Sequence, residues 1–179
     1  MATTTDINER IKALSVERAQ RKRDALRIYR PRSRKIERFH RSPASEKILR
    51  GGAGSGKSCA GFAELASAAT GIPLIGIDGE ELPFKYPKAP LLIWTVGFGW
   101  DHIGETIHRY LFTEMSGMKM IRDNNTNEYR IFQPWDEDDA ARSKEVEADT
   151  QLIPKRLIDQ SQWAWENKGA KQFKRCVLK

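Results

Sequence analysis

A glycine-rich motif at residues 51–58, with the sequence GGAGSGKS, constrains the fold of this chain more than any other feature. It fits the pattern G-x-x-x-x-G-K-[S/T], a loop whose backbone N–H groups surround phosphate oxygens. Glycines permit the positive φ angles and the close backbone approach that such a loop needs. The apolar residues 48–49 predict a short strand over 47–50, and a helix is predicted over 57–69. The motif therefore predicts a strand, a phosphate-binding loop and a helix, in that order.

Each residue type in the motif suits the phosphates of a nucleoside triphosphate. The helix that begins at Lys57 directs the positive end of its dipole toward the anion. Lys57 can reach the β- and γ-phosphates, and the Ser58 hydroxyl can ligate Mg²⁺. We therefore expect ATP and Mg²⁺ as ligands, with Lys57 and Ser58 as catalytic residues and Ser58 as the metal ligand. The expected nucleotide-binding residues are Gly51, Gly52, Ala53, Gly54, Ser55, Gly56, Lys57, Ser58 and Cys59.

Later apolar patterns predict the rest of the domain. Residues 91–96 form a continuous apolar run, as expected of a strand buried on both faces. A helix capped by Asp101 should follow it, to about residue 112. Residues 72–90 are rich in proline and glycine, which favours a loop or a small hairpin. The alternation of strands and helices predicts an α/β fold with a mainly parallel sheet flanked by helices.

The C-terminal third carries weaker patterns. Two short strands are expected within residues 120–132, followed by an acidic and partly helical stretch. Pro154 is expected to open a helix to about residue 167, with Trp163 and Trp165 at its core and rim. Phe173 is expected to begin another strand. The four carboxylates of residues 136–139 are interpreted as a solvated acidic loop and not as a metal site.

Positive charge is concentrated in the first fifty residues. They hold fifteen Lys and Arg against six Asp and Glu, whereas the other residues hold sixteen against eighteen. This asymmetry suggests an acidic partner such as nucleic acid, although a solvated arm is an alternative. We divide the chain into a basic helical arm and connector (1–45) and a P-loop core (46–179). A helix is predicted over residues 6–29, with a basic side formed by Arg18, Arg21, Lys22, Arg23 and Arg27.

The composition excludes other classes of protein. The longest apolar runs are too short to cross a bilayer, and residues 1–10 lack the apolar core of a signal peptide. Cys59 and Cys176 have no zinc-site spacing, which favours reduced thiols in the cytoplasm. His40, His102 and His108 show no metal-ligand spacing either. We therefore expect a cytoplasmic protein with no membrane partner.

The wider pattern resembles the large terminase subunits of tailed bacteriophages, which pump DNA into proheads. The resemblance covers roughly residues 29–179, and only the P-loop is a sharp motif. It rests on the sequences YRP (29–31), FHRS (39–42), the P-loop with its preceding strand (48–58), ATG (69–71), LIWTVG (92–97), WDHI (100–103) and IP (153–154).

The resemblance implies a RecA-like ATPase that couples ATP hydrolysis to DNA translocation. It implies double-stranded DNA as a partner, portal and small terminase subunits as further candidates, and an oligomer when assembled on the prohead. The basic arm could then bind DNA or dock on an acidic patch of one of these proteins. In the family, the segment before the P-loop contacts adenine, and Arg34, Lys35 and Ile36 occupy that region here.

The family also needs an apolar strand that ends in Asp-Glu, where Asp orients Mg²⁺ and Glu activates water. The nearest candidate is LIGID at residues 74–78, but Gly79 follows Asp78 where Glu should stand. We therefore expect the acidic strand beyond Lys179, in a longer ATPase, and a poorly active 179-residue chain. The alternatives are a non-catalytic module that binds nucleotide and DNA or protein, and another P-loop ATPase such as a helicase-like protein.

Overall fold

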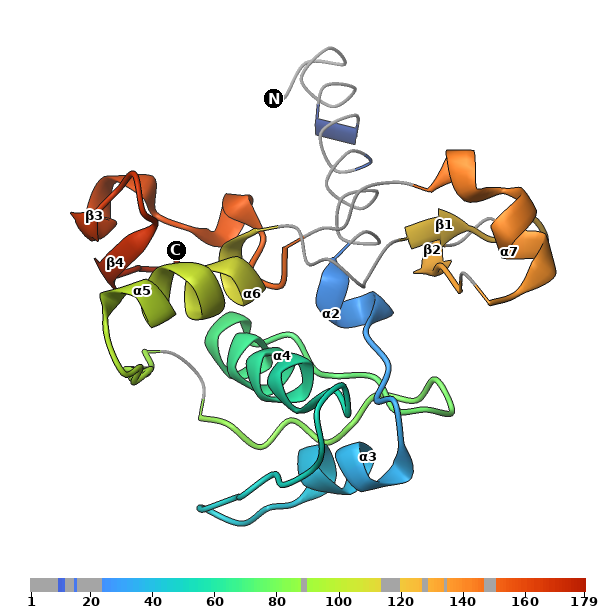
Figure 1. Cartoon of the computed structure of the whole chain (residues 1–179), viewed down its shortest axis with the longest axis horizontal. Helices are drawn as coiled ribbons and strands as arrows, with labels where there is room; N and C mark the ends of the chain where they lie inside the picture. Colours follow the sequence, from blue (N-terminus) through green and yellow to red (C-terminus); the bar gives the residue numbers. More distant parts are fainter. Residues whose placement is uncertain are drawn as a thin grey trace, which may run out of the picture.

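The structure is a computed structural model that describes residues 10, 11, 15, 24–87, 90–113, 120–126, 129–133, 135–146 and 151–179. Helix α4 (Lys57–Thr70) lies at its centre. The β1–β2 sheet and α7 lie on one side of α4, and the β3–β4 sheet lies with α5 and α6 on the other (Figure 1). Of the predicted basic helix, Arg18, Arg21, Lys22 and Arg23 lie outside the described residues.

Two short helices precede α4 and pack against it. Helix α2 (Ala25–Ile28) ends before Pro31, as expected, and buries Leu26 completely. It begins only after Asp24, whose backbone is extended with ψ 124°, so the prediction of one continuous helix over residues 6–29 is wrong. Helix α3 (Arg34–Arg41) begins at Ser33, whose Oγ accepts the Ile36 N–H at 3.4 Å. Both helices contribute buried residues, so the described part of the predicted connector packs on the P-loop half of the chain.

Small residues let α4 occupy the middle of the molecule. Ala60, Ala63 and Ala66 are fully buried, and they allow α2, α3 and α6 to approach closely. The rings of Phe62 and Tyr110 stack at a centroid distance of 4.8 Å and join α4 to α6. The helix ends at Thr70 because Gly71 adopts φ 72° as its C-cap. The prediction of this helix is confirmed.

The expected hairpin and the expected helix after residue 100 are both present. Residues 74–82 form a small hairpin, with an antiparallel bridge between Ile75 and Glu81. Helix α5 (Trp100–His102), the π-helix η1 (Ile103–His108) and α6 (Arg109–Phe112) follow one another without a break. The N-cap is Gly99, so the prediction of Asp101 as the cap is wrong; Asp101 Oδ1 instead accepts a hydrogen bond from Gln172 at 2.8 Å.

The C-terminal third forms two separate hairpins. Strands β1 (Met120–Arg122) and β2 (Tyr129–Ile131) pair antiparallel, as predicted. Strands β3 (Ala164–Asn167) and β4 (Gln172–Arg175) also pair antiparallel. The intervening helical pieces are α7 (Glu137–Ala141) and the 3-10 turns η2 (Ser143–Glu145), η3 (Lys155–Leu157) and η4 (Gln160–Gln162).

The prediction of a helix from Pro154 is wrong. Only the single turns η3 and η4 form there, and Trp163 and Trp165 belong to the start of the β3–β4 hairpin. Their rings stack at 4.7 Å and pack beside His108 and Phe173. This aromatic packing between distant parts of the chain outweighs the local helical signal of Pro154.

The predicted fold class, a RecA-like P-loop fold with a mainly parallel sheet, is also wrong. In the described part of the chain both sheets have two strands, and both are antiparallel. Residues 47–50 and 91–97 form neither helix nor strand, and among the described residues neither segment pairs with a strand. Ile48 is 80% exposed, Leu92 83% and Val96 87%. An apolar run indicates only that side chains favour burial; a strand also needs a hydrogen-bonding neighbour.

Across the residues that the structure describes, every helix is too short or too polar to cross a bilayer. The helices that form the core are instead amphipathic or rich in small residues, and they bury a common set of apolar side chains around α4.

Candidate phosphate-binding loop

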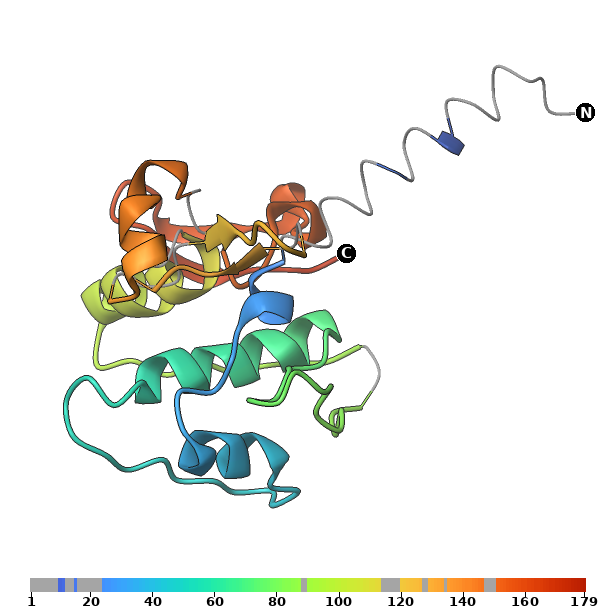
Figure 2. The ribbon, with the colours of Figure 1, turned by 90° about the vertical axis from the view of Figure 1, so that its right-hand side faces the viewer.

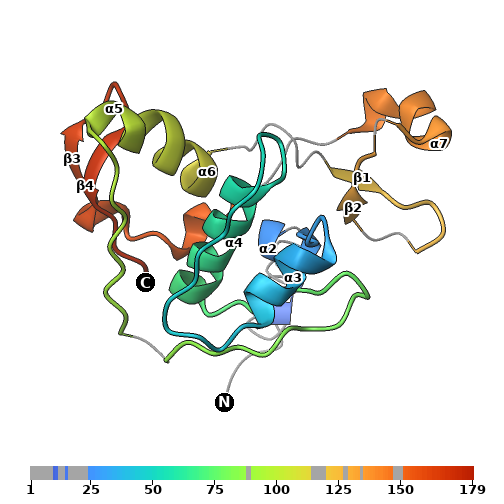
Figure 3. The ribbon, with the colours of Figure 1, turned by 60° about the horizontal axis from the view of Figure 1, so that its bottom comes forward.

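Residues 51–56 join the segment 47–50 to the N-terminus of α4. From α3 the chain runs back along α4 before it turns into the helix (Figure 3). The loop projects at the N-terminal end of α4, away from the β1–β2 and β3–β4 hairpins (Figure 2). Gly51, Gly52, Ala53, Gly54 and Ser55 are all exposed. The predicted phosphate-binding residues therefore lie together at an accessible end of the central helix.

Two glycines give the loop its shape. Gly54 has φ 71° and Gly56 has φ 82°, the left-handed region that residues with a Cβ rarely adopt. Gly56 is also the N-cap of α4, with no side-chain cap. A Cβ at Gly51 would lie 2.8 Å from Ser55 Oγ, so the two ends of the loop approach each other closely. Glycine is therefore favoured at position 51 by the close approach of Ser55, and at positions 54 and 56 by the positive φ angle.

The Lys57 side chain folds back onto the loop that precedes it. Its ammonium donates hydrogen bonds to the Gly51 carbonyl at 2.7 Å, to the Gly52 carbonyl at 2.6 Å and to Ser55 Oγ at 3.4 Å. These contacts account for the three donors of an ammonium group. A phosphate that approaches Lys57 must therefore replace at least one loop acceptor, and a charged phosphate oxygen is a stronger acceptor than a carbonyl.

The first turn of α4 supplies donors for an anion. The first intrahelical hydrogen bond runs from the Ala60 N–H to the Gly56 carbonyl at 2.9 Å, so the amides of Lys57, Ser58 and Cys59 precede it. No acidic residue lies in this turn, and the helix dipole adds a partial positive charge. The exposed Ser58 hydroxyl at the same turn suits Mg²⁺, which takes few ligands from protein when phosphates and water supply the others.

Cys59 lies in the first turn of α4, and its side chain is half-buried. The side chain packs against the hydrophobic core, and burial raises the pKa of the thiol although Arg32 lies near enough to lower it. Arg32 reaches the loop as well, because a Cβ at Gly56 would lie 3.3 Å from its Cδ. Sequence reasoning did not single out Arg32.

Of the other predicted positions, Ile36 lies beside the loop, because a Cβ at Gly56 would lie 3.5 Å from its Cδ1. Asp78 occupies the exposed turn of the 74–82 hairpin. In the region expected to contact adenine, Ile36 is buried in the core, Lys35 is exposed, and Arg34 pairs with Glu37 at 3.2 Å. These side chains are directed by the packing of α3 on α4.

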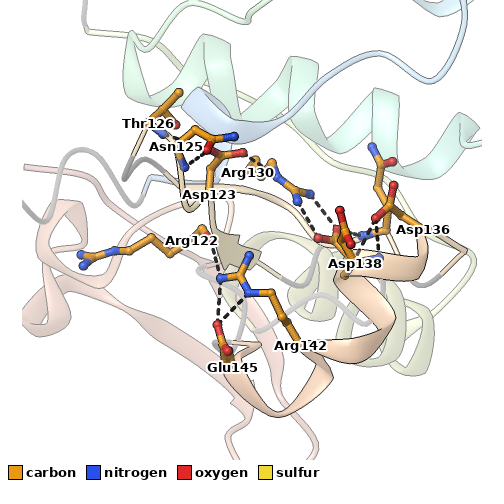
Figure 4. A network of polar contacts seen from close by, with 11 residues as sticks. Arg122, Asp123, Asn125, Thr126, Arg130, Asp136, Asp138, Arg142 and Glu145 are labelled. Atoms are coloured by element: carbon orange, nitrogen blue, oxygen red, sulfur yellow. Dashed lines mark hydrogen bonds and ion pairs between the residues drawn. The ribbon is translucent and has the colours of Figure 1, made fainter.

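The acidic residues 136–139 form a helix start and a buried ion pair (Figure 4). Asp136 caps α7 by accepting the N–H groups of Asp138 and Asp139. Asp139 is completely buried and accepts two hydrogen bonds from Arg130, at 2.7 and 2.5 Å. Arg130 therefore holds the pKa of the Asp139 carboxyl below its usual range, although burial opposes this. The interpretation of these residues as a solvated loop is wrong for Asp139.

Sequence reasoning also missed a buried polar cluster halfway along α4. Glu64 is buried, and its carboxylate contacts His40, Lys47, Lys85 and Tyr86. A single glutamate within the otherwise uncharged sequence SCAGFAELASAAT was the available signal, because a buried carboxylate needs partners. The described residues hold no group of three or more His, Cys, Asp or Glu side chains suited to a metal ion.

No protein-family model, curated protein or solved structure matches the chain.

Proposed function

We propose that the chain binds Mg²⁺-ATP at residues 51–59, as the ATP-binding part of a DNA-packaging ATPase of the large-terminase type. One observation carries the nucleotide-binding part of the proposal. The motif loop leads directly into the N-terminus of a fourteen-residue helix with a glycine N-cap and no acidic residue in its first turn. Such a helix start favours a bound anion. The assignment to the large-terminase type rests on the sequence resemblance in addition to this geometry.

The residues of the loop have distinct tasks in this proposal. The amides of the first turn of α4 donate to phosphate oxygens, and Lys57 exchanges a loop carbonyl for a phosphate oxygen. Ser58 contributes a hydroxyl ligand to Mg²⁺, which neutralises phosphate charge when it is bound. The left-handed Gly54 and Gly56 preserve the loop shape that these contacts require. The binding chemistry is therefore positioning and charge neutralisation.

A non-catalytic nucleotide-binding module is the second candidate, and the distribution of acids favours it for the isolated chain. The first turn of α4 carries no carboxylate, and Asp78 lies in an exposed hairpin turn. Neither position supplies an acid that activates water beside Lys57. We therefore expect the 179-residue chain to hydrolyse ATP slowly, whether it acts in packaging or as another P-loop protein.

The substitution Lys57→Ala tests nucleotide binding. Hydrogen bonds to charged groups contribute about 1.5–3 kcal/mol, so the loss should weaken Mg²⁺-ATP binding by about 10- to 100-fold in a calorimetric titration. Lys155→Ala removes an exposed lysine from η3 and is the matched control, with unchanged affinity expected. Equal affinities of Lys57→Ala and the wild type would overturn the proposal.

We propose double-stranded DNA as the partner of the basic N-terminal part. Residues 1–50 carry the positive excess, and Lys35 and Arg38 are exposed on α3. Removal of residues 1–23, which hold six Lys and Arg against three Asp and Glu, should lower DNA affinity and flatten its salt dependence in an anisotropy titration at two salt concentrations, because fewer counterions are released. The deletion stops before Asp24, which pairs with Arg156 at 2.6 Å, and before the buried Leu26. An unchanged salt slope would favour docking on an acidic protein instead.

A further inference from the structure

A buried carboxylate joins three separate segments to the helix that begins at the phosphate loop. Glu64 Oε2 lies 2.6 Å from His40 Nδ1, and this contact holds α3. Glu64 Oε1 contacts Lys47, Tyr86 and, at 2.9 Å, Lys85. One side chain of α4 therefore fixes α3, the segment before the loop and the segment after the 74–82 hairpin.

The charges of this cluster depend on one another. Burial alone would raise the pKa of the Glu64 carboxyl, but hydrogen bonds from His40, Lys47, Tyr86 and Lys85 outweigh it and hold the pKa far below its usual range. Burial and the neighbouring Lys47 lower the pKa of Lys85, although Glu64 opposes them. Without the carboxylate, two ammonium groups would face each other in a partly buried site, which is unfavourable. The cluster is therefore a strong constraint on the segments that it joins.

The position of Lys47 makes this constraint relevant to the phosphate loop. Lys47 lies four residues before Gly51, in a segment that pairs with no strand among the described residues. Glu64 lies seven residues after Lys57 on α4, about 10 Å along the helix. The Lys47 ammonium also lies 4.7 Å from the centre of the Phe39 ring. The loop is thus attached to α4 on both sides, covalently at Lys57 and through an ion pair at Lys47.

A chemical role for the cluster fits the geometry less well. Tyr29, His40 and Glu64 form a chain, with Tyr29 Oη 2.9 Å from His40 Nε2. Tyr29 and His40 are both buried, so a substrate has no access to the tyrosine oxygen. Burial, followed by Cys59 and Glu64, also raises the pKa of Tyr29 far above its ordinary value, which opposes a phenolate nucleophile. The cluster acts through the segments that it holds.

We propose that Glu64 and Lys47 are positioning residues that set the conformation of the phosphate loop, in place of the sheet pairing that residues 47–50 lack among the described residues. This inference rests on the proposed binding of Mg²⁺-ATP. The ion pair fixes where the chain enters the loop, and the loop in turn fixes the carbonyls of Gly51 and Gly52 that hold Lys57. Loss of the ion pair should therefore weaken phosphate binding without removal of any group that touches the phosphate.

A pair of matched substitutions tests this inference. Lys47→Met and Lys85→Met each remove one ammonium from the same Glu64 oxygen and retain an apolar stem. Only Lys47 belongs to the segment that leads into the loop. Lys85 also donates to the His40 and Ser42 carbonyls, so we expect at least as large a loss of thermal stability in Lys85→Met as in Lys47→Met. We nevertheless expect about a tenfold loss of Mg²⁺-ATP affinity in Lys47→Met and less than a twofold loss in Lys85→Met. Lys47→Arg, which keeps the charge, should restore most of the affinity.

Hydrogen exchange gives a second measurement that does not depend on nucleotide. In the free protein, amides of residues 57–61 should exchange several-fold faster in Lys47→Met than in Lys85→Met, because the loop before α4 is released. Equal exchange in the two variants overturns the inference even if ATP does not bind. Loss of ATP binding in Lys57→Ala, together with equal affinities of Lys47→Met and Lys85→Met, overturns the positioning role alone. Failure of the wild type to bind ATP contradicts the proposed function instead.

Discussion

The phosphate loop and the Arg130–Asp139 pair both place a cation among several acceptors, but they are built in opposite ways. Lys57 is held by two backbone carbonyls and a hydroxyl in an exposed loop. Arg130 is held by the carboxylates of Asp123 and Asp139, and Asp139, on α7, is completely buried. The first cation has neutral partners, whereas the second has charged ones.

This difference decides which of the two cations is available to a ligand. A neutral carbonyl competes weakly with a phosphate oxygen, so Lys57 can exchange partners at low cost. Arg130 would have to leave a buried carboxylate uncompensated, which costs several kcal/mol. A basic side chain whose only partners are neutral backbone groups is therefore a better candidate for anion binding than one paired with a buried carboxylate. The Arg130 pair instead stabilises the β1–β2–α7 unit.

The largest expected effect concerns Asp139. Asp139→Ala leaves Arg130 with fewer acceptors and removes the acceptor of the Gln133 N–H, at 2.9 Å in the wild type. We expect a loss of about 2–3 kcal/mol in the free energy of unfolding, somewhat less than for a fully buried pair because Arg130 is 37% exposed. Mg²⁺-ATP affinity should not change. Urea unfolding and calorimetric titration measure the two quantities.

Asp138→Ala is the matched control, because Asp138 is the exposed neighbour in the same helix. Its unfolding free energy should change by no more than about 0.5 kcal/mol. The effect of Asp139→Ala should also depend on pH. Because Arg130 lowers the pKa of Asp139 in the folded state, the stabilisation is complete well above the unfolded pKa of about 3.9 and is lost as pH falls below it. A constant difference between wild type and variant down to pH 2 would contradict this role.

Much of the local structure could be predicted from the sequence. The P-loop pattern, the helix that ends at Gly71 and the β1–β2 pair follow from glycine positions, small residues and turn residues close together in the chain. These features depend on neighbours within a few residues. The position of Lys57 at the start of a helix, and therefore its place in the candidate site, could be predicted for the same reason.

The features that were predicted wrongly or missed depend on partners far away in the sequence. Residues 91–97 have the apolar character of a buried strand, but pairing requires a neighbour that the run itself does not specify. Trp163 and Trp165 pack beside His108, more than fifty positions earlier, and this contact replaced the expected helix. Glu64 needed partners at 40, 47, 85 and 86, which no local pattern connects.

The smallest expected effects come from the glycines of the loop, and they test whether backbone conformation holds the site of Lys57. Gly52 has open space around it and no positive φ, Gly54 has φ 71° with open space, and Gly56 has φ 82° and the Arg32 side chain nearby. Alanine at Gly54 should cost roughly 1 kcal/mol of loop stability from φ alone, and alanine at Gly56 somewhat more. Gly52→Ala should cost nothing or stabilise slightly, because it restricts the unfolded chain.

Hydrogen exchange in the first turn of α4 and urea unfolding should both rank the destabilisation as Gly56→Ala, then Gly54→Ala, then Gly52→Ala. Equal exchange rates and equal unfolding free energies of the three variants would mean that the side chains of Lys57 and Lys47, and not the backbone conformation, determine the shape of the loop. The loop would then resemble the Arg130–Asp139 pair, which depends on side-chain contacts.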